Sequence, residues 1–97
     1  MPRNGDDREE RGYRVRGRVQ GVGFRWWARG IAESLEIGGT VRNLVDGSVE
    51  VRACGRAKDL DELEEKLREG PRFSHVDSVE LFEAGPISHP DEFRVER

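Results

Sequence analysis

The sequence predicts an α+β domain in which two helices cover one face of an antiparallel sheet. Three observations lead to this fold class. Apolar and polar residues alternate from Tyr13 to Gln20, as in a half-buried strand. Two later segments carry apolar residues at helical spacing, one beginning at Phe24 and one spanning residues 57–69. Between them, the pair Asp46-Gly47 is a strong hairpin signal.

The first strand and helix follow from residue spacing. The inner face of the strand is predicted to carry Tyr13, Val15, Gly17 and Val19. The helix that begins at Phe24 would bury one stripe, formed by Phe24, Trp27, Ala28, Ile31, Ala32 and Leu35. Gly30 lies inside this helix and costs about 1 kcal/mol relative to alanine.

A hairpin and a second helix come next. Strands are predicted from Thr40 to Leu44 and from Ser48 to Cys54, joined by a type I′ turn with positive φ at both central residues. The second helix is expected from Ala57 to Glu69, because leucines 60, 63 and 67 form one stripe. Gly70-Pro71 is a typical helix stop.

Two further strands complete the pattern. Val76 to Phe82 has strand character, and Phe93 and Val95 alternate with charged residues as in a short edge strand. The element order therefore predicts a split βαβ, or ferredoxin-like α/β sandwich (βαββαβ), with an antiparallel sheet and both helices on one face. The opposite face is predicted to be solvated and to carry Arg14, Arg16, Arg18, Glu50 and Arg52.

Composition limits the classes of function. The chain has 97 residues, of which 38% are charged and 34% hydrophobic, and its net charge is −3. This balance gives no general attraction to nucleic acid or to anionic lipid. No apolar run approaches the roughly 20 residues that span a bilayer. A single cysteine, Cys54, excludes an internal disulfide and a multi-cysteine metal site.

The chain is expected to form one domain after a polar leader. Residues 1–12 lack apolar periodicity and resemble no signal peptide, so we predict a disordered leader followed by a domain over residues 13–97. We expect a cytoplasmic monomer that binds neither nucleic acid nor membranes.

The segment between the first strand and the first helix is the candidate binding site. It reads Gln20, Gly21, Val22, Gly23, Phe24, Arg25. Two glycines allow backbone conformations in which successive amides point into one concavity. The helix start adds unpaired amides, and Arg25 can hold an anion with two parallel hydrogen bonds. The loop therefore suits phosphate, although the spacing alone also fits a tight turn with no ligand.

Two motifs carry a specific resemblance. Residues 17–25 read G-R-V-Q-G-V-G-F-R, and residues 39–50 read G-T-V-R-N-L-V-D-G-S-V-E. These resemble the two signatures of the acylphosphatase family, and the resemblance covers about residues 13–97. It implies a ferredoxin-like fold and hydrolysis of small acyl phosphates to a carboxylate and inorganic phosphate. It also implies that no metal or organic cofactor takes part.

The resemblance also assigns roles to individual residues. Arg25 matches the arginine that binds phosphate, and Asn43 matches the asparagine that positions the attacking water. Without the resemblance, the residues favour reading Asn43 as a strand-end residue that bonds its own turn. One departure concerns Glu36, where the family often has a glycine that would suit a left-handed helix end.

Two other functions are alternatives to hydrolysis. The domain could bind carbamoyl phosphate as part of a larger enzyme, without turnover of its own. It could also bind RNA, but that requires exposed aromatic residues on the central strands, and residues 49–54 contain none. Among the remaining side chains, His75, His89 and Trp26 are expected at the surface, and Cys54 is expected to be packed.

Overall fold

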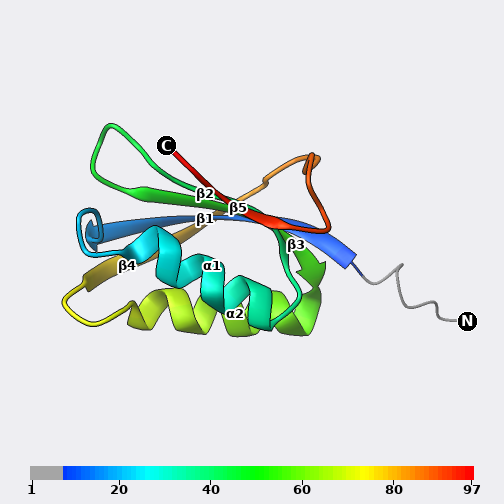
Figure 1. Ribbon diagram of the computed structural model, residues 1–97, viewed down its shortest axis with the longest axis horizontal. Coiled ribbons are helices and arrows are strands. Elements are labelled where there is room, and N and C mark those ends of the chain that lie inside the picture. Colours follow the sequence, from blue (N-terminus) through cyan, green and yellow to red (C-terminus); the bar gives the residue numbers. More distant parts are fainter. Residues whose placement is uncertain (1–7) are drawn as a thin grey trace, which may run out of the picture.

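The predicted order of elements is confirmed in the computed structural model, which describes residues 8–97 (Figure 1). The elements are β1 (Arg8–Arg18), α1 (Phe24–Ser34), β2 (Gly38–Asn43), β3 (Val49–Arg56), α2 (Ala57–Glu69), β4 (His75–Phe82) and β5 (Phe93–Glu96). Both helices lie on the same face of the sheet, as predicted. None of the described helices is long and apolar enough to cross a bilayer.

The sheet has five strands in the order β4-β1-β3-β2-β5. The first three strand pairs are antiparallel, but β5 pairs with the edge of β2 in parallel. The prediction of an antiparallel sheet was therefore wrong at this edge. The segment after β4 crosses the molecule before β5 begins, so β5 runs in the same direction as β2 (Figure 1).

Strand β1 begins at Arg8, earlier than the predicted start at Tyr13. Arg8 to Arg11 pair with β3, where Arg8 lies opposite Arg56. Main-chain pairing and the ion pair between Arg11 Nη1 and Asp61 Oδ1, at 2.6 Å, hold this polar extension. The predicted disordered leader was thus wrong for residues 8–12, and its residues 1–7 lie outside the described part of the chain.

The core lies between the sheet and the two helices. The predicted helix stripes are confirmed, since Phe24, Ala28 and Ala32 of α1 are buried, as are all three leucines of α2. Tyr13 is fully buried on β1, and its hydroxyl donates to the carbonyl oxygen of Leu60 at 3.0 Å. Burial raises the pKa of Tyr13 to about 12. This aromatic ring is not available to stack on a base.

The β2–β3 hairpin has a different turn from the predicted type I′. Only Gly47 has positive φ (94°), whereas type I′ requires it at both central residues. The amide of Gly47 bonds the carbonyl of Leu44, and the amide of Leu44 bonds the carbonyl of Ser48. Asp46 Oδ1 accepts from the amide and the hydroxyl of Ser48, at 2.9 and 2.6 Å. These carboxylate bonds stabilise a turn that needs one left-handed residue instead of two.

The face of the sheet opposite the helices is polar, but it is not fully solvated. Glu50 is only 5% exposed, which contradicts the expectation of a wet carboxylate. Its oxygens are surrounded by the guanidinium groups of Arg14, Arg42 and Arg52. Residues 86–89 line a cavity on this same face.

Candidate active site

The glycine loop joins β1 to α1 at one end of the sheet. Gly21 and Gly23 both have a φ of 78°, and a Cβ at either position would contact nothing within 4 Å. The glycines are therefore required by the backbone conformation and not by lack of space. Gly23 is the N-cap of α1 and provides no side-chain hydrogen bond to the helix.

The main-chain amides of this loop lack internal acceptors. Outside the helices and strands of residues 8–97, no backbone hydrogen bond is donated by an amide between Gln20 and Trp26. The first turn of α1 also contains no acidic residue. Because a helix start carries partial positive charge and unpaired donors, this end of α1 attracts an anion.

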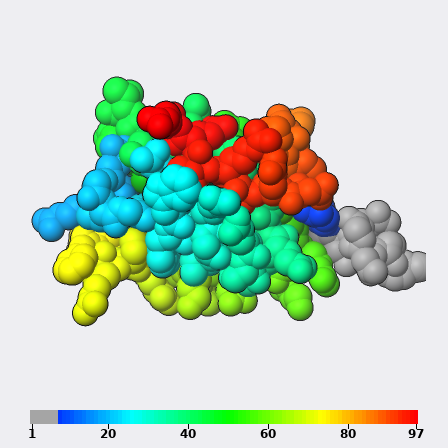
Figure 2. Space-filling view, viewed as in Figure 1, coloured from blue at the N-terminus to red at the C-terminus, as the bar shows by residue number. Residues whose placement is uncertain are grey.

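Arg25 lies in the first turn of α1, and its guanidinium reaches the last strand. Its Nη1 donates to the carbonyl oxygen of Glu96 at 2.8 Å. Figure 2 shows α1 and β5 side by side on this surface of the molecule. In the parallel pairing of β2 with β5, Glu96 lies opposite Arg42, the residue before Asn43. The guanidinium of Arg25 is therefore held near the end of β2.

Asn43 is the last residue of β2 and pairs with Val49 of β3. It shares the helix-covered face with Val41, which is fully buried. Its side chain is half-buried, and it forms no side-chain hydrogen bond with another described residue. The alternative reading, in which Asn43 bonds its own turn, finds no support in this geometry, since Asp46 fulfils that role.

Gln20 links the glycine loop to the hairpin that follows Asn43. Its Nε2 donates to the carbonyl oxygens of Leu44 and Ser48, each at 2.8 Å. These two residues flank the Asn43–Val49 pair at the end of β2 and β3. The side-chain donor of Gln20 is thus already engaged, and only its main-chain amide could donate to an anion. No local sequence pattern predicts this link, because both acceptors are main-chain carbonyls far along the chain.

Phe24 and Val22 pack into the core. Phe24 is 2% exposed, and its ring packs edge-on against Trp27, with the two ring centroids 5.3 Å apart. Val22 is half-buried against the same core. Any contact of these two residues with an anion would therefore involve their main-chain amides. The loop of residues 20–25 and Asn43 lie at the same end of the sheet. Among these residues, only Arg25 contributes a cationic side chain.

Comparisons with known proteins find one family along nearly the whole chain. A protein-family model for acylphosphatase matches residues 11–95. An acylphosphatase of Koribacter versatilis is 49% identical over 88 residues, which are 91% of this chain and 80% of that protein. The chain belongs to the acylphosphatase family. The solved structure of an acylphosphatase from Coxiella burnetii has a TM-score of 0.88 at 36% identity, covering 99% of this chain and 100% of that one.

A larger protein also contains a similar fold. The crystal structure of T. kodakarensis HypF matches with a TM-score of 0.80 and 31% identity, covering 90% of this chain but only 12% of that one. An acylphosphatase-like fold thus occurs as part of a much longer chain.

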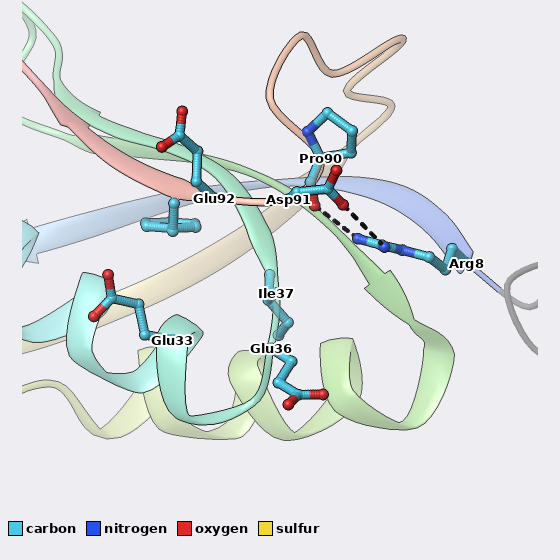
Figure 3. A pocket seen from close by; sticks show the side chains of 8 residues that line it. Arg8, Glu33, Glu36, Ile37, Pro90, Asp91 and Glu92 are labelled. Atoms are coloured by element: carbon cyan, nitrogen blue, oxygen red, sulfur yellow. Dashed lines mark hydrogen bonds and ion pairs between the residues drawn. The ribbon is translucent and has the colours of Figure 1, made fainter.

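A separate cavity lies at the other end of the sheet from the glycine loop and Asn43. It has a volume of about 480 Å³ and lies between the end of α1 and the segment before β5 (Figure 3). Glu33, Glu36, Asp91 and Glu92 make its lining acidic. Arg8, its one basic residue, donates to the carbonyl of Pro90 at 2.7 Å and lies 3.7 Å from Asp91. Such a lining disfavours phosphate.

The remaining sequence candidates lie away from the motifs or carry no chemistry. His75 is exposed on β4, and His89 is half-buried in the segment before β5. Cys54 is a buried free thiol, as expected. Trp26 is 59% exposed, and the guanidinium carbon of Arg29 lies 5.7 Å from the centroid of its ring. Among residues 8–97, no three His, Cys, Asp or Glu side chains gather closely enough to hold a metal ion.

Proposed function

We propose that this chain hydrolyses the carboxyl–phosphate anhydride of small acyl phosphates, giving a carboxylate and inorganic phosphate. The observation that carries the proposal is the arrangement of the glycine loop. Its unpaired amides at the start of α1 lie at the same end of the sheet as Arg25 and Asn43. Membership of the acylphosphatase family supports the same reaction.

The amides of residues 20–25 and the guanidinium of Arg25 would bind the phosphoryl group. Phosphoryl transfer depends mainly on positioning and on electrostatic stabilisation of the oxygens. The amides act as fixed donors, and Arg25 adds a full positive charge. Its bond to the carbonyl of Glu96 uses Nη1 and keeps the guanidinium at the site in the absence of substrate.

Asn43 would position the attacking water, because a carboxamide can accept from and donate to one water at once. The water oxygen attacks phosphorus, the bond from phosphorus to the acyl oxygen breaks, and the carboxylate leaves with that electron pair. A carboxamide is too weak a base to take the water proton, so a phosphate oxygen of the substrate receives it. No metal or organic cofactor enters this scheme.

Release of phosphate from benzoyl phosphate tests the activity, and two variants test the roles. Asn43→Ala should lower kcat by about 10²–10³-fold, as for loss of one oriented catalytic donor. Inorganic phosphate should still inhibit this variant at the same phosphate concentration as it inhibits the wild type. Arg25→Ala should lower kcat and weaken phosphate inhibition together. Arg29→Ala is the control, since it removes a guanidinium one turn further along α1 that pairs with Glu33. Full turnover by Asn43→Ala would refute the water-positioning role.

A similar fold forms part of the longer chain of T. kodakarensis HypF, so the second candidate function is a domain that binds its ligand as part of a larger enzyme, without turnover. Benzoyl phosphate separates the two functions, because a binding module would bind phosphate but release none from the substrate. We further propose that the chain acts as a cytoplasmic monomer and does not use nucleic acid as a partner. Sedimentation of the purified chain would test the monomer.

A further inference from the structure

A row of five charged residues crosses the face of the sheet opposite the helices, one on each strand. The strand registers place Glu80 opposite Arg14, Arg14 opposite Glu50, Glu50 opposite Arg42, and Arg42 opposite Glu96. The signs of the charges alternate across the whole sheet. We call these five residues the charge row, and opposite charges at directly paired positions attract one another.

Glu50 is the buried centre of the charge row. Its side chain is 6% exposed, and its Oε1 accepts from Arg42 Nε at 2.9 Å and from Arg52 Nε at 3.3 Å. Arg14 Nη2 lies 3.8 Å from its other oxygen. A buried carboxylate strongly favours keeping its cationic partners, because removal of one leaves charge uncompensated. Glu50 therefore fixes the position of Arg42.

The cavity beside the charge row has a volume of about 260 Å³ and does not indicate a ligand of either sign. Its lining contains Arg42 and Arg52 together with Glu50 and Glu96, so these charges balance. The arginines on this face are thus neutralised mainly by the protein itself. Their effect must be sought in what they hold in place.

Arg42 connects the charge row to both proposed site residues. It is joined by one peptide bond to Asn43, whose side chain lies on the other face of the strand. Across the parallel pair it lies opposite Glu96, whose carbonyl oxygen accepts from Arg25. Any twist or slide of the end of β2 relative to β5 would therefore move Asn43 relative to Arg25.

We propose that Glu50 and Arg42 are positioning residues for Asn43, acting from the face of the sheet opposite the reaction. The hydrogen bond from Arg42 to Glu50 fixes the end of β2, while Gln20 fixes the hairpin beyond it. Asn43 is thereby held from both sides along the chain. This inference rests on the proposed function, because it assigns a cause to the position of the water-binding carboxamide.

The test compares two arginines that bind the same carboxylate. Arg42→Met removes the guanidinium next to Asn43. Arg52→Met removes a guanidinium that binds Glu50 through Nε and the carbonyl oxygen of Ala84 through Nη1, at 2.6 Å. Arg42→Lys is a milder variant that keeps the charge but loses the donor geometry of Nε, and it serves if Arg42→Met fails to fold. Turnover of benzoyl phosphate and inhibition by inorganic phosphate are measured on folded protein.

We expect Arg42→Met to lower kcat by about 10–100-fold, as for an ångström-scale displacement of a reacting group, with phosphate inhibition within threefold of wild type. Arg42→Lys should fall between wild type and Arg42→Met. Arg52→Met should lower the unfolding temperature but keep kcat within threefold. The Asn43 side-chain amide signals in NMR spectra should shift in Arg42→Met more than in Arg52→Met.

Two results would overturn the inference. One is a kcat of Arg42→Met, or of Arg42→Lys where only that variant folds, within threefold of wild type. The other is an equal fall in kcat in Arg52→Met, which would indicate a general loss of stability. Wild-type protein that releases no phosphate from benzoyl phosphate would instead refute the proposed function, and the NMR comparison would still test the effect of Arg42 on Asn43.

Discussion

Replacement of Gln20 by leucine should separate the glycine loop from the hairpin that carries Asn43. Gln20 Nε2 is the only donor in its side chain, and it bonds the carbonyls of Leu44 and Ser48 at 2.8 Å each. Leucine has a similar size but no donor. The variant therefore removes both bonds, and each carbonyl oxygen keeps only its main-chain donor, the amide of Gly47 for Leu44 and the amide of Leu44 for Ser48.

The size of the effect follows from these two bonds. A neutral hydrogen bond contributes about 0.5–1.5 kcal/mol to stability, so loss of both should cost about 1–3 kcal/mol. In a domain of about 100 residues each kcal/mol lowers the unfolding temperature by roughly 4–8 °C, so 2 kcal/mol corresponds to about 8–16 °C. The main-chain amides remain, so phosphate inhibition should stay within threefold. Because Asn43 is less well positioned, kcat should fall at least about tenfold.

Two quantities are measured. Circular dichroism gives the unfolding temperature, and turnover of benzoyl phosphate, below the unfolding temperature of the variant, gives kcat. Ser74→Ala is the control, because it removes one hydroxyl-to-carbonyl bond, to Pro71 at 2.6 Å, that involves neither Gln20 nor the β2–β3 hairpin. It should lose stability and keep its turnover. If Gln20→Leu unfolds at the wild-type temperature, or turns over substrate at the wild-type rate, the linking role of Gln20 is wrong.

Three further predictions concern stability. Gly30→Ala should stabilise the exposed side of α1 by about 0.5–1 kcal/mol, since a Cβ there meets nothing within 4 Å, and a lower or unchanged urea midpoint would contradict this. Glu36→Gly should stabilise by about 1 kcal/mol, because Glu36 has a φ of 58°, a left-handed conformation that costs a residue with a Cβ about 1–2 kcal/mol; thermal unfolding measures it. Hydrogen bonds from the Ser48 hydroxyl and amide, with help from Arg16, lower the pKa of Asp46 from 3.8 to about 2. The charged form is favoured in the folded state, so this contribution to stability is complete above pH 3.8 and is lost as the pH falls through about 2. Asp46→Asn should therefore flatten the dependence of unfolding temperature on pH between about 4 and 2, and an unchanged slope would refute it.

The sequence predicted best the elements with strong local signals. Helix α2 has the predicted bounds, Ala57–Glu69, because its leucine stripe is regular and Gly70 stops it with a left-handed φ of 73°. The start of β1 was missed because Arg8 to Arg11 carry no alternation, and their strand conformation depends on pairing with β3. The parallel direction of β5 was missed for the same reason, since strand partners are chosen by tertiary packing.

The burial of Glu50 could not be predicted from alternation. Its position on β3 places it on the polar face, and the pattern says nothing about what covers that face. Three arginines from three strands meet this carboxylate, and only the sheet register brings them together. Alternation predicts the face on which a side chain lies, whereas burial on that face depends on the partners across the sheet.

The two motifs supply the site in different ways, and this determines how each should respond to substitution. In the glycine loop, Gly21 and Gly23 act through backbone conformation, Phe24 through the core and Gln20 through the hairpin, so most side chains shape the loop without facing a ligand. Arg25 is the exception in the loop, and Asn43 is its counterpart in the second motif. A loop built in this way depends on packing that lies outside it. Substitutions in the core or hairpin should therefore reduce turnover through the position of Asn43 before they reduce phosphate binding, since the amides proposed to bind phosphate lie at the start of α1 and not on the hairpin.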